Sequence, residues 1–168
     1  MRPLWAAADF LRASRRELRY GQFSRAPLHF LRVEWRSGVT RCDWLTREAD
    51  RWDDNLHPPE RERNLLQQTL TDAIALRRAL FDFFPDVQLA VLRAFRREAR
   101  EPPELVLEGC VSRVAPYLEK VSSLVMRAKL YGFQFDLEDG MLRPLRIRGL
   151  GNASDVLDGD VQLDRVTR

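Results

Sequence analysis

Lysine, histidine and cysteine are scarce in this sequence, and each scarcity narrows the chemistry open to it. Of the 28 basic residues only Lys120 and Lys129 are lysines, so arginine carries almost all of the positive charge. Histidine occurs only at His29 and His57, which leaves little material for histidine-based catalysis. Sequence motifs of nucleophilic catalysis and of dinucleotide or phosphate loops are absent. We therefore expect a protein that is not an enzyme and that uses no cofactor.

Long apolar runs are missing as well. No uninterrupted stretch approaches the roughly 20 residues of a membrane span, and Asp9 and Arg12 break the N-terminal segment before a secretory signal could form. The only cysteines, Cys42 and Cys110, lie in strand-like patterns and resemble small buried hydrophobic residues of a reducing compartment. A disulfide between them remains an alternative. The sequence predicts cytoplasmic residence and no transmembrane segment.

The arginine-rich composition has two interpretations. Arginine is the preferred fork for phosphate and carboxylate groups, which indicates nucleic acid, lipid headgroups or an acidic partner. A coding preference for arginine would give the same composition without function, because 25 acidic residues leave a net charge of only +3. The distribution is uneven: residues 1–47 hold ten arginines and four acids, whereas residues 149–168 hold two arginines and four aspartates. Any basic face is expected near the N-terminus.

Length and patterning predict an α+β protein. A chain of 168 residues, 45% hydrophobic and 32% charged, suits one folded domain. We expect a single compact domain over residues 1–148, with antiparallel hairpins packed against about three helices in the order α-β-β-α-β-β-α-β-β. Gly, Asn, Ser and Asp dominate residues 149–168, which predicts a mobile tail. The helices are expected over residues 4–20, from about residue 60 to Pro85, and over residues 115–131.

The best-defined element is a hairpin over residues 28–46 about Ser37-Gly38. Pairing outward from this turn places three apolar pairs on one face and two opposite-charge pairs on the other. The apolar face pairs Trp35 with Thr40, Val33 with Cys42 and Leu31 with Trp44; the charged face pairs Glu34 with Arg41 and Arg32 with Asp43. All four tryptophans, Trp5, Trp35, Trp44 and Trp52, are expected in the core or on a hairpin face.

Two further strand pairs are expected later in the chain. Alternation at Val87, Leu89 and Val91 resumes at residues 105–111 after a charged, proline-bearing connection. Residues 133–137 alternate as one strand into Asp139-Gly140, a strong type I′ hairpin signal. That turn predicts Leu137 opposite Leu142 and Asp136 opposite Arg143, with Pro144 on a sheet edge.

The segment from Leu105 to Val111, sequence LVLEGCV, resembles the strand signature of BON domains, and Gly132-Phe133-Gln134-Phe135 is similar to the glycine and apolar strand that close such a domain. The resemblance covers about residues 64–142, an αββαβ unit. It departs from the family at the phenylalanine-rich end of the first helix. It implies an interaction module associated with membranes or phospholipid.

Two groups of residues are candidates for a site. Asp50, Asp53, Asp54 and His57 have side chains that bind divalent metals or pair a general base with a carboxylate, although acids are also ordinary in a surface connector. The first expected helix presents Arg12, Arg15, Arg16 and Arg19, which suit an anionic membrane or nucleic-acid phosphates, although Asp9 and Glu17 interrupt the patch.

The leading functional hypothesis is a non-enzymatic interaction module that binds a partner protein, or its own copies as a homo-oligomer, through exposed sheet edges or the N-terminal helix. One alternative is binding of nucleic acid or anionic lipid through the arginine-rich N-terminal region. Another is a metal-dependent enzyme built on the aspartates and the histidine of residues 50–57.

Overall fold

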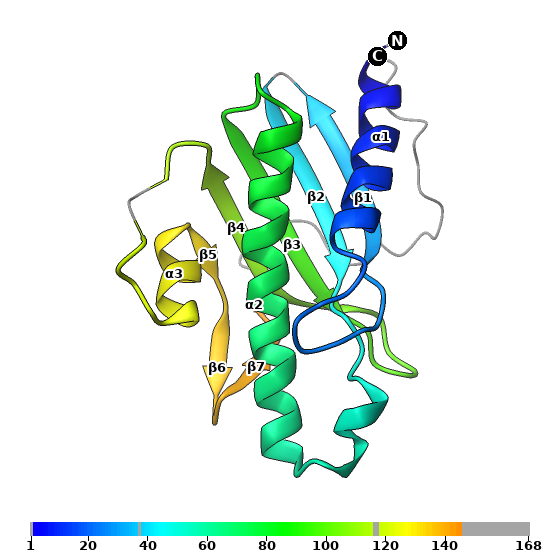
Figure 1. Ribbon diagram of the computed structural model, residues 1–168, viewed down its shortest axis with the longest axis vertical. Coiled ribbons are helices and arrows are strands. Elements are labelled where there is room, and N and C mark those ends of the chain that lie inside the picture. Colours follow the sequence, from blue (N-terminus) through cyan, green and yellow to red (C-terminus); the bar gives the residue numbers. More distant parts are fainter. Residues whose placement is uncertain (1, 37, 116–117, 146–168) are drawn as a thin grey trace.

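The fold is that of an α+β protein, as the sequence predicted. The computed structural model describes residues 2–36, 38–115 and 118–145 (Figure 1). Its elements follow in the expected order, apart from an extra break near the C-terminal end. The elements are α1 (Arg2–Glu17), β1 (His29–Arg36), β2 (Val39–Leu45), the 3-10 turn η1 (Arg51–Asn55), α2 (Pro58–Phe83), β3 (Leu89–Arg96), β4 (Glu104–Ser112), α3 (Leu124–Leu130), β5 (Phe133–Gln134), β6 (Asp136–Glu138) and β7 (Met141–Arg143).

Five strands form one mixed sheet in the order β1-β2-β3-β4-β5. The hairpins β1–β2 and β3–β4 are antiparallel, and they join along β2 and β3, which run parallel because α2 returns the chain across the sheet. The three helices lie on the same face of this sheet, with α2 over the middle, α1 over the β1 side and α3 over the β5 side (Figure 1). The parallel junction was not predicted from the sequence.

The β1–β2 hairpin confirms most of the predicted register. Trp35 pairs with Thr40, Val33 with Cys42, Glu34 with Arg41 and Arg32 with Asp43. The pairing of Leu31 with Trp44 was wrong, because the register shifts between Phe30 and Arg32 and brings Phe30 opposite Trp44. Phe30 therefore enters the main core, and Leu31 packs with a smaller cluster on the other face of the sheet.

The first two helices differ from prediction only at their ends. Helix α1 ends at Glu17 rather than near Gly21, because the carbonyls of Leu18 and Arg19 accept hydrogen bonds from the Arg47 guanidinium at 2.6 and 3.4 Å. Helix α2 begins at Pro58, where proline suits the first turn, and ends before Pro85 as expected.

The third helix is much shorter than predicted. It begins at Leu124, where Ser123 caps the helix by accepting a hydrogen bond from the Met126 N–H at 3.3 Å. Of the residues before it, Leu118 and Val121 form a turn, in which the Val121 N–H donates to the Leu118 carbonyl. The longer helix was predicted from continuous apolar spacing, but the Ser123 cap sets the start of the helix at Leu124.

Residues 133–138 form two strands rather than one. The Phe133–Gln134 strand pairs with β4, whereas β6 leaves the main sheet and pairs with β7 in a separate hairpin. The turn between β6 and β7 has positive φ at Asp139 (53°) and Gly140 (77°), which confirms type I′ geometry. Leu137 lies opposite Leu142 and Asp136 opposite Arg143, as predicted.

The core lies between the helices and the sheet. Trp44 and Phe10 are among its largest fully buried side chains, and apolar residues of α2, β3 and β4 fill the rest. Two of the four tryptophan predictions were wrong, because Trp5 is 67% and Trp52 77% exposed. Cys42 is buried as expected, but Cys110 is exposed, and both thiols are free.

Several predictions concern parts of the chain outside the described residues. Ser37 and Tyr117, as well as the tail predicted over residues 149–168, belong to this group. Among the helices of the described residues, none combines the length and the apolar character needed to cross a membrane.

Candidate functional site

The outer edge of β1 is one of the two edges of the five-stranded sheet. Within residues 2–36, 38–115 and 118–145, β1 pairs with β2 and with no other strand. Arg36 and Val39 flank the two-residue turn, so they form a hydrogen-bonded pair, and pairs alternate from there along an antiparallel ladder. Val33 and Trp35 consequently direct their backbone N–H and C=O groups away from β2, toward the outside of the sheet.

Helix α1 lies over β1, and one of its flanks is turned toward this edge (Figure 1). Glu17 and Leu18 line a groove with Ile74 and Arg78 of α2, and Phe10 contacts the Phe83 ring at 5.7 Å, so that flank of α1 faces α2. At 100° per residue, Ala8 and Arg15 lie on the opposite flank, whereas Arg12 projects away from the sheet, opposite the buried Ala7, Phe10 and Ser14. We call the flank of Ala8 and Arg15, with the backbone edge of Arg32–Arg36, the edge surface.

The four arginines predicted as a basic surface are all exposed. Arg12 forms an exposed ion pair with Asp9 at 2.9 Å. By helical spacing Arg15 lies on the flank toward the β1 edge, whereas Arg12 and Arg16 point away from the sheet. Arg19 follows the end of the helix, where its guanidinium lies 5.2 Å from the centre of the Tyr20 ring. Whether these exposed arginines form a binding surface stays a prediction.

The sheet face opposite the helices carries an ion-pair network. The Arg93 guanidinium donates to both carboxylate oxygens of Asp43, at 2.8 and 2.6 Å, and Arg32 approaches the same carboxylate at 3.9 Å. Asp43 is fully buried, although it lies on the face opposite the three helices. The hydrogen bonds to Asp43 raise the pKa of Arg93 against the opposing effect of burial. Arg93 therefore stays charged, and its two hydrogen bonds to Asp43 hold β2 to β3.

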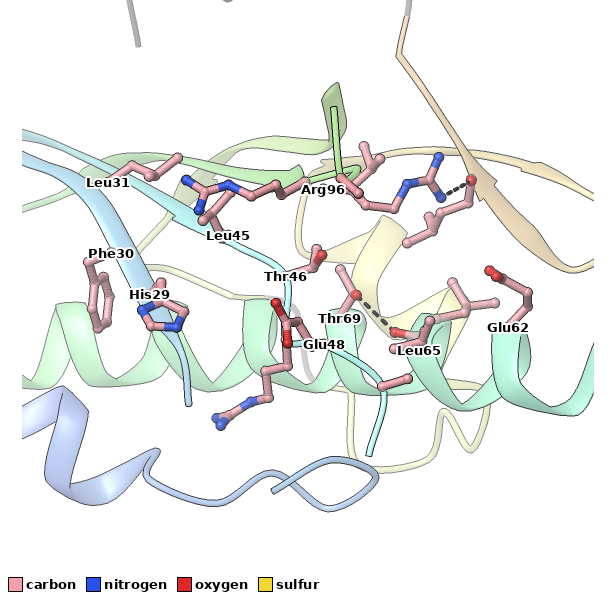
Figure 2. A pocket seen from close by; sticks show the side chains of 17 residues that line it. His29, Phe30, Leu31, Leu45, Thr46, Glu48, Glu62, Leu65, Thr69 and Arg96 are labelled. Carbon is pink, nitrogen blue, oxygen red and sulfur yellow. Dashed lines mark hydrogen bonds between the residues drawn. The ribbon is translucent and has the colours of Figure 1, made fainter. Parts of the chain in front are cut away.

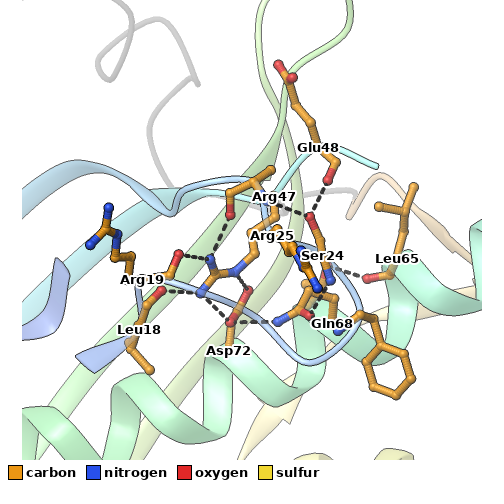
Figure 3. Close-up of polar contacts among 12 residues, drawn as sticks. Leu18, Arg19, Ser24, Arg25, Arg47, Glu48, Leu65, Gln68 and Asp72 are labelled. Atoms are coloured by element: carbon orange, nitrogen blue, oxygen red, sulfur yellow. Dashed lines mark hydrogen bonds and ion pairs between the residues drawn. The ribbon is translucent and has the colours of Figure 1, made fainter. Parts of the chain in front are cut away.

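A buried clamp fixes the segment between α1 and β1 to α2 (Figure 3). The Arg47 Nε donates to Asp72 at 2.9 Å, and its terminal nitrogens donate to the carbonyls of Ala26 and Leu18 at 2.7 and 2.6 Å. Gln68 joins the clamp, because its Nε2 donates to Asp72 and its Oε1 accepts the backbone N–H groups of Phe23 and Ser24.

Asp72 is buried, and burial makes its negative charge energetically unfavourable. Burial raises the pKa of Asp72 above its ordinary value, and the hydrogen bonds from Arg47 and Gln68 oppose that rise. Sequence inspection missed this clamp, although a signal was present: Gln68 and Asp72 are polar residues four apart within the apolar stripe of a helix.

A pocket of about 630 Å³ opens at the end of the sheet where β1 begins (Figure 2). Apolar side chains of β1, β2, α2 and β4 line this pocket. Polar side chains, among them His29, Thr69 and Arg96, line it as well. Arg96 is held by the Leu142 carbonyl at 3.0 Å and by Glu104 at 3.2 Å. The labelled lining residues are His29, Phe30, Leu31, Leu45, Thr46, Glu48, Glu62, Leu65, Thr69 and Arg96.

Of the residues proposed as a metal site, Asp50 has a structural role. Asp50 accepts hydrogen bonds from the backbone N–H groups of Trp52 and Arg25, and thereby caps η1. His57 precedes α2 as its N-cap residue and makes no capping hydrogen bond through its side chain. Among the residues that the structure describes, no three His, Cys, Asp or Glu side chains gather in a way that could hold a metal ion. The metal site stays a prediction.

Two further groups have shifted pKa values. Burial raises the pKa of the Cys42 thiol, and the charge of Asp43 raises it further, so this cysteine stays protonated and unreactive. Burial lowers the pKa of Arg77, whose guanidinium lies 4.4 Å from the centre of the Tyr131 ring. Arg77 also donates to the carbonyls of Ser112 and Arg113, which ties α2 to the end of β4.

Comparisons with protein-family models, with curated proteins and with solved structures give no match for this chain. The resemblance to BON domains therefore stays a prediction. The fold defines the chain as an α+β protein.

Proposed function

We propose that the chain is a non-catalytic module that binds a partner protein by taking up an extended segment of that partner as an added strand along β1. The observation that carries this proposal is the outward direction of the backbone groups of Val33 and Trp35. Strand addition of this kind draws its affinity from main-chain hydrogen bonds and its specificity from alternate side chains.

The surroundings of β1 support strand addition. The register shift between Phe30 and Arg32 interrupts the edge at its start, so the regular part available for pairing is Arg32–Arg36. The ring centres of Trp35 and Phe84 lie 5.7 Å apart, so Trp35 holds this part of the edge against the core. A rigid edge lowers the entropy that binding must overcome.

The test places a proline at a residue whose backbone N–H is needed only for pairing along the outer edge of β1. Val33→Pro removes one outward N–H, and proline is accepted in edge strands when its missing N–H faces outward. The full chain is used to select binders from a random library of 12-residue peptides. We expect selected peptides to bind the wild-type chain and to lose at least tenfold in affinity for Val33→Pro.

Glu34→Pro serves as the matched control, because Glu34 directs its backbone groups toward β2 and its replacement should destabilise the hairpin itself. Circular dichroism and thermal unfolding must show that Val33→Pro stays folded. Selected peptides that bind Val33→Pro as tightly as wild type would refute strand addition, as would a library that yields no binder.

A second function, binding of anionic lipid or nucleic acid, is favoured by one separate observation. Trp5 is 67% exposed, and at helical spacing it shares the outer face of α1 with Arg12 and Arg16. We expect any such binding to weaken steeply with salt and on replacing both arginines by glutamine. Vesicles with anionic lipid and single-stranded DNA, each tested from low to moderate salt, provide the measurement; no binding at low salt would exclude this function.

A further inference from the structure

We propose that the pocket at the start of β1 binds a small organic amine with an apolar body. Its volume of about 630 Å³ is typical of small-molecule sites, which measure about 300–1,000 Å³. The residues of the edge surface that are proposed to pair with a partner, Arg32–Arg36, do not line this pocket. Amine binding is therefore a second function, independent of strand addition along β1.

Two irregularities of strand pairing meet at this pocket. Leu31 is skipped in the pairing of β1 with β2, and Val106 is skipped in the pairing of β4 with β3. Both of these extra residues line the pocket. An extra residue bends its strand and changes the direction of nearby side chains, and such bulges are over-represented next to active sites. Both hairpins therefore depart from regular pairing at the same end of the sheet, around one cavity.

The pocket also lies at the carboxyl ends of the two parallel strands. Strand β2 ends at Leu45 and β3 at Arg96, and both residues line the pocket. Thr46 and Arg97, which follow them, line it as well. In open α/β sheets, ligands bind in the crevice outside the carboxyl ends of the parallel strands. The pocket has the same position relative to β2 and β3, which favours a ligand site.

The apolar lining suits the body of a ligand, and one buried hydroxyl sets the polarity of the group that it can meet. Phe30, Leu66 and Leu142 line the pocket and belong to the main core. Thr69 is buried, and its hydroxyl donates to the Leu65 carbonyl at 2.8 Å (Figure 2). Because the hydroxyl hydrogen is already used, Thr69 can only accept a hydrogen bond from a ligand.

The arginines of the lining are mostly paired within the chain. Arg47 pairs with Asp72 at 2.9 Å, and Arg96 with Glu104 at 3.2 Å. Arg97 lies exposed on the connection after β3, where water solvates its charge. An anionic ligand would therefore have to compete with Asp72 or Glu104 for a guanidinium, or stay beside the solvated Arg97.

The carboxylates of the lining, Glu48 and Glu62, have no such partners. In the part of the chain that the structure describes, neither of them forms an ion pair. Glu62 is half-buried and rises from α2 toward the strands (Figure 2). Its neighbours one turn away along α2 are prolines on one side and leucines on the other, so the helix offers it no cation. A carboxylate beside apolar walls is stabilised by a paired cation, which a protonated amine would supply.

The experiment titrates the full chain with three probes that share one apolar body and differ in the charge of the end group: naphthylethylamine, naphthylethanol and naphthylpropionate. Binding is followed by NMR of labelled leucine methyl groups. We expect the amine to shift the methyl signals of Leu31, Leu65 and Leu142. It should bind about tenfold more tightly than the alcohol, the carboxylate should bind most weakly, and the preference for the amine should shrink with salt.

Three variants locate the site and its charge. Glu62→Gln should bind the amine about as weakly as the alcohol and leave the affinity for the alcohol unchanged. Glu60→Gln is the matched control, because Glu60 is an exposed carboxylate of the same helix that does not line the pocket; it should bind all probes as wild type does. Ala49→Trp fills the pocket from a half-buried lining position and should weaken all three probes. Circular dichroism must show that each variant stays folded.

Several results would overturn amine binding in this pocket. Equal affinity for the amine and the alcohol, or tighter binding of the carboxylate, would contradict the charge of the ligand. Methyl shifts confined to leucines outside the pocket, or no binding of any probe, would contradict the site. Equal losses in Glu62→Gln and Glu60→Gln would show only a general effect of net charge. Val33→Pro changes only the outer edge of β1 and should bind the amine as wild type does, so a failure of strand addition would leave this site standing.

Discussion

Asp43 and Arg93 lie directly opposite each other on the parallel strands β2 and β3, and the guanidinium of Arg93 binds both oxygens of the Asp43 carboxylate. Removing one partner of a buried ion pair leaves an uncompensated charge, which typically costs about 3 kcal/mol or more. We expect Asp43→Asn to lower the free energy of unfolding by about 3 kcal/mol, measured by urea titration. Arg41→Gln on the exposed part of β2 is the control and should change it by less than about 0.5 kcal/mol. Equal effects of the two substitutions would contradict a structural role for the pair.

The clamp between Arg47 and Asp72 predicts unequal single substitutions. Arg47→Met leaves a buried carboxylate and the carbonyls of Leu18 and Ala26 without their donor, so it should cost about 3 kcal/mol or more. Asp72→Asn should cost less, about 1–2 kcal/mol, because burial already disfavours the charge of Asp72.

Hydrogen exchange gives a local measure of the same clamp. Arg47→Met should increase exchange at the backbone amides of residues 18–26, since Arg47 binds the carbonyls at both ends of this segment. Arg25→Met is a suitable control, because Arg25 lies in the same segment and its hydrogen bond to Asp50 uses the backbone N–H, which the substitution keeps. Unchanged exchange in the Arg47 variant would show that the segment is held by other contacts.

Gly109 predicts a steric test of the β4–β5 pairing. A Cβ added there would lie 2.5 Å from the Phe133 ring, which is itself buried. Gly109→Ala should therefore cost about 1–3 kcal/mol, and Phe133→Leu in the same chain should recover part of that loss. Thermal unfolding of the two single variants and the double variant tests this coupling; strictly additive losses would rule it out.

The two thiols should differ in reactivity and in their response to pH. Cys110 is exposed and Cys42 buried, so a thiol reagent should modify one cysteine per native chain and two after denaturation. Burial raises the pKa of Cys42 in the folded state, so the folded chain keeps the proton that the unfolded chain releases above about pH 8.5.

Stability contributed by Cys42 is therefore present below that pH and lost as the pH rises above it. Cys42→Ala should flatten the alkaline decline in the free energy of unfolding, and Cys110→Ser is the control. An identical decline in wild type and Cys42→Ala would contradict this assignment.

Local features of the fold could be predicted from the sequence, whereas contacts between distant segments could not. Two-residue periodicity on both sides of Ser37-Gly38 predicted the hairpin register correctly as far as Arg32, and the Asp139-Gly140 pair predicted the second turn. The extra residue near Leu31 left no local signal, because Phe30 and Leu31 are both apolar and either could continue the alternation.

The candidate site was likewise predictable only in its local features. The exposed arginines of α1 were identified, but their relation to β1 depends on the crossover of α2, which no local pattern specifies. Asp43 was assigned to Arg32, its neighbour across the hairpin, whereas its closest partner Arg93 is 50 residues away in sequence. The pairing of two strands brought together by a helix must be known before that contact can be inferred.

The parallel junction of β2 and β3 also orders the events of folding. Each hairpin closes around a short connection, whereas the junction must bring together residues 50 apart and waits for α2 to bridge them. The two hairpins are therefore the units that can form early, and closure of their common seam is the slow event. A substitution that weakens the seam should slow folding, while one on the outer edge of β1 should leave the folding rate unchanged. The edge proposed to take up a partner is thus kinetically separate from the step that completes the sheet.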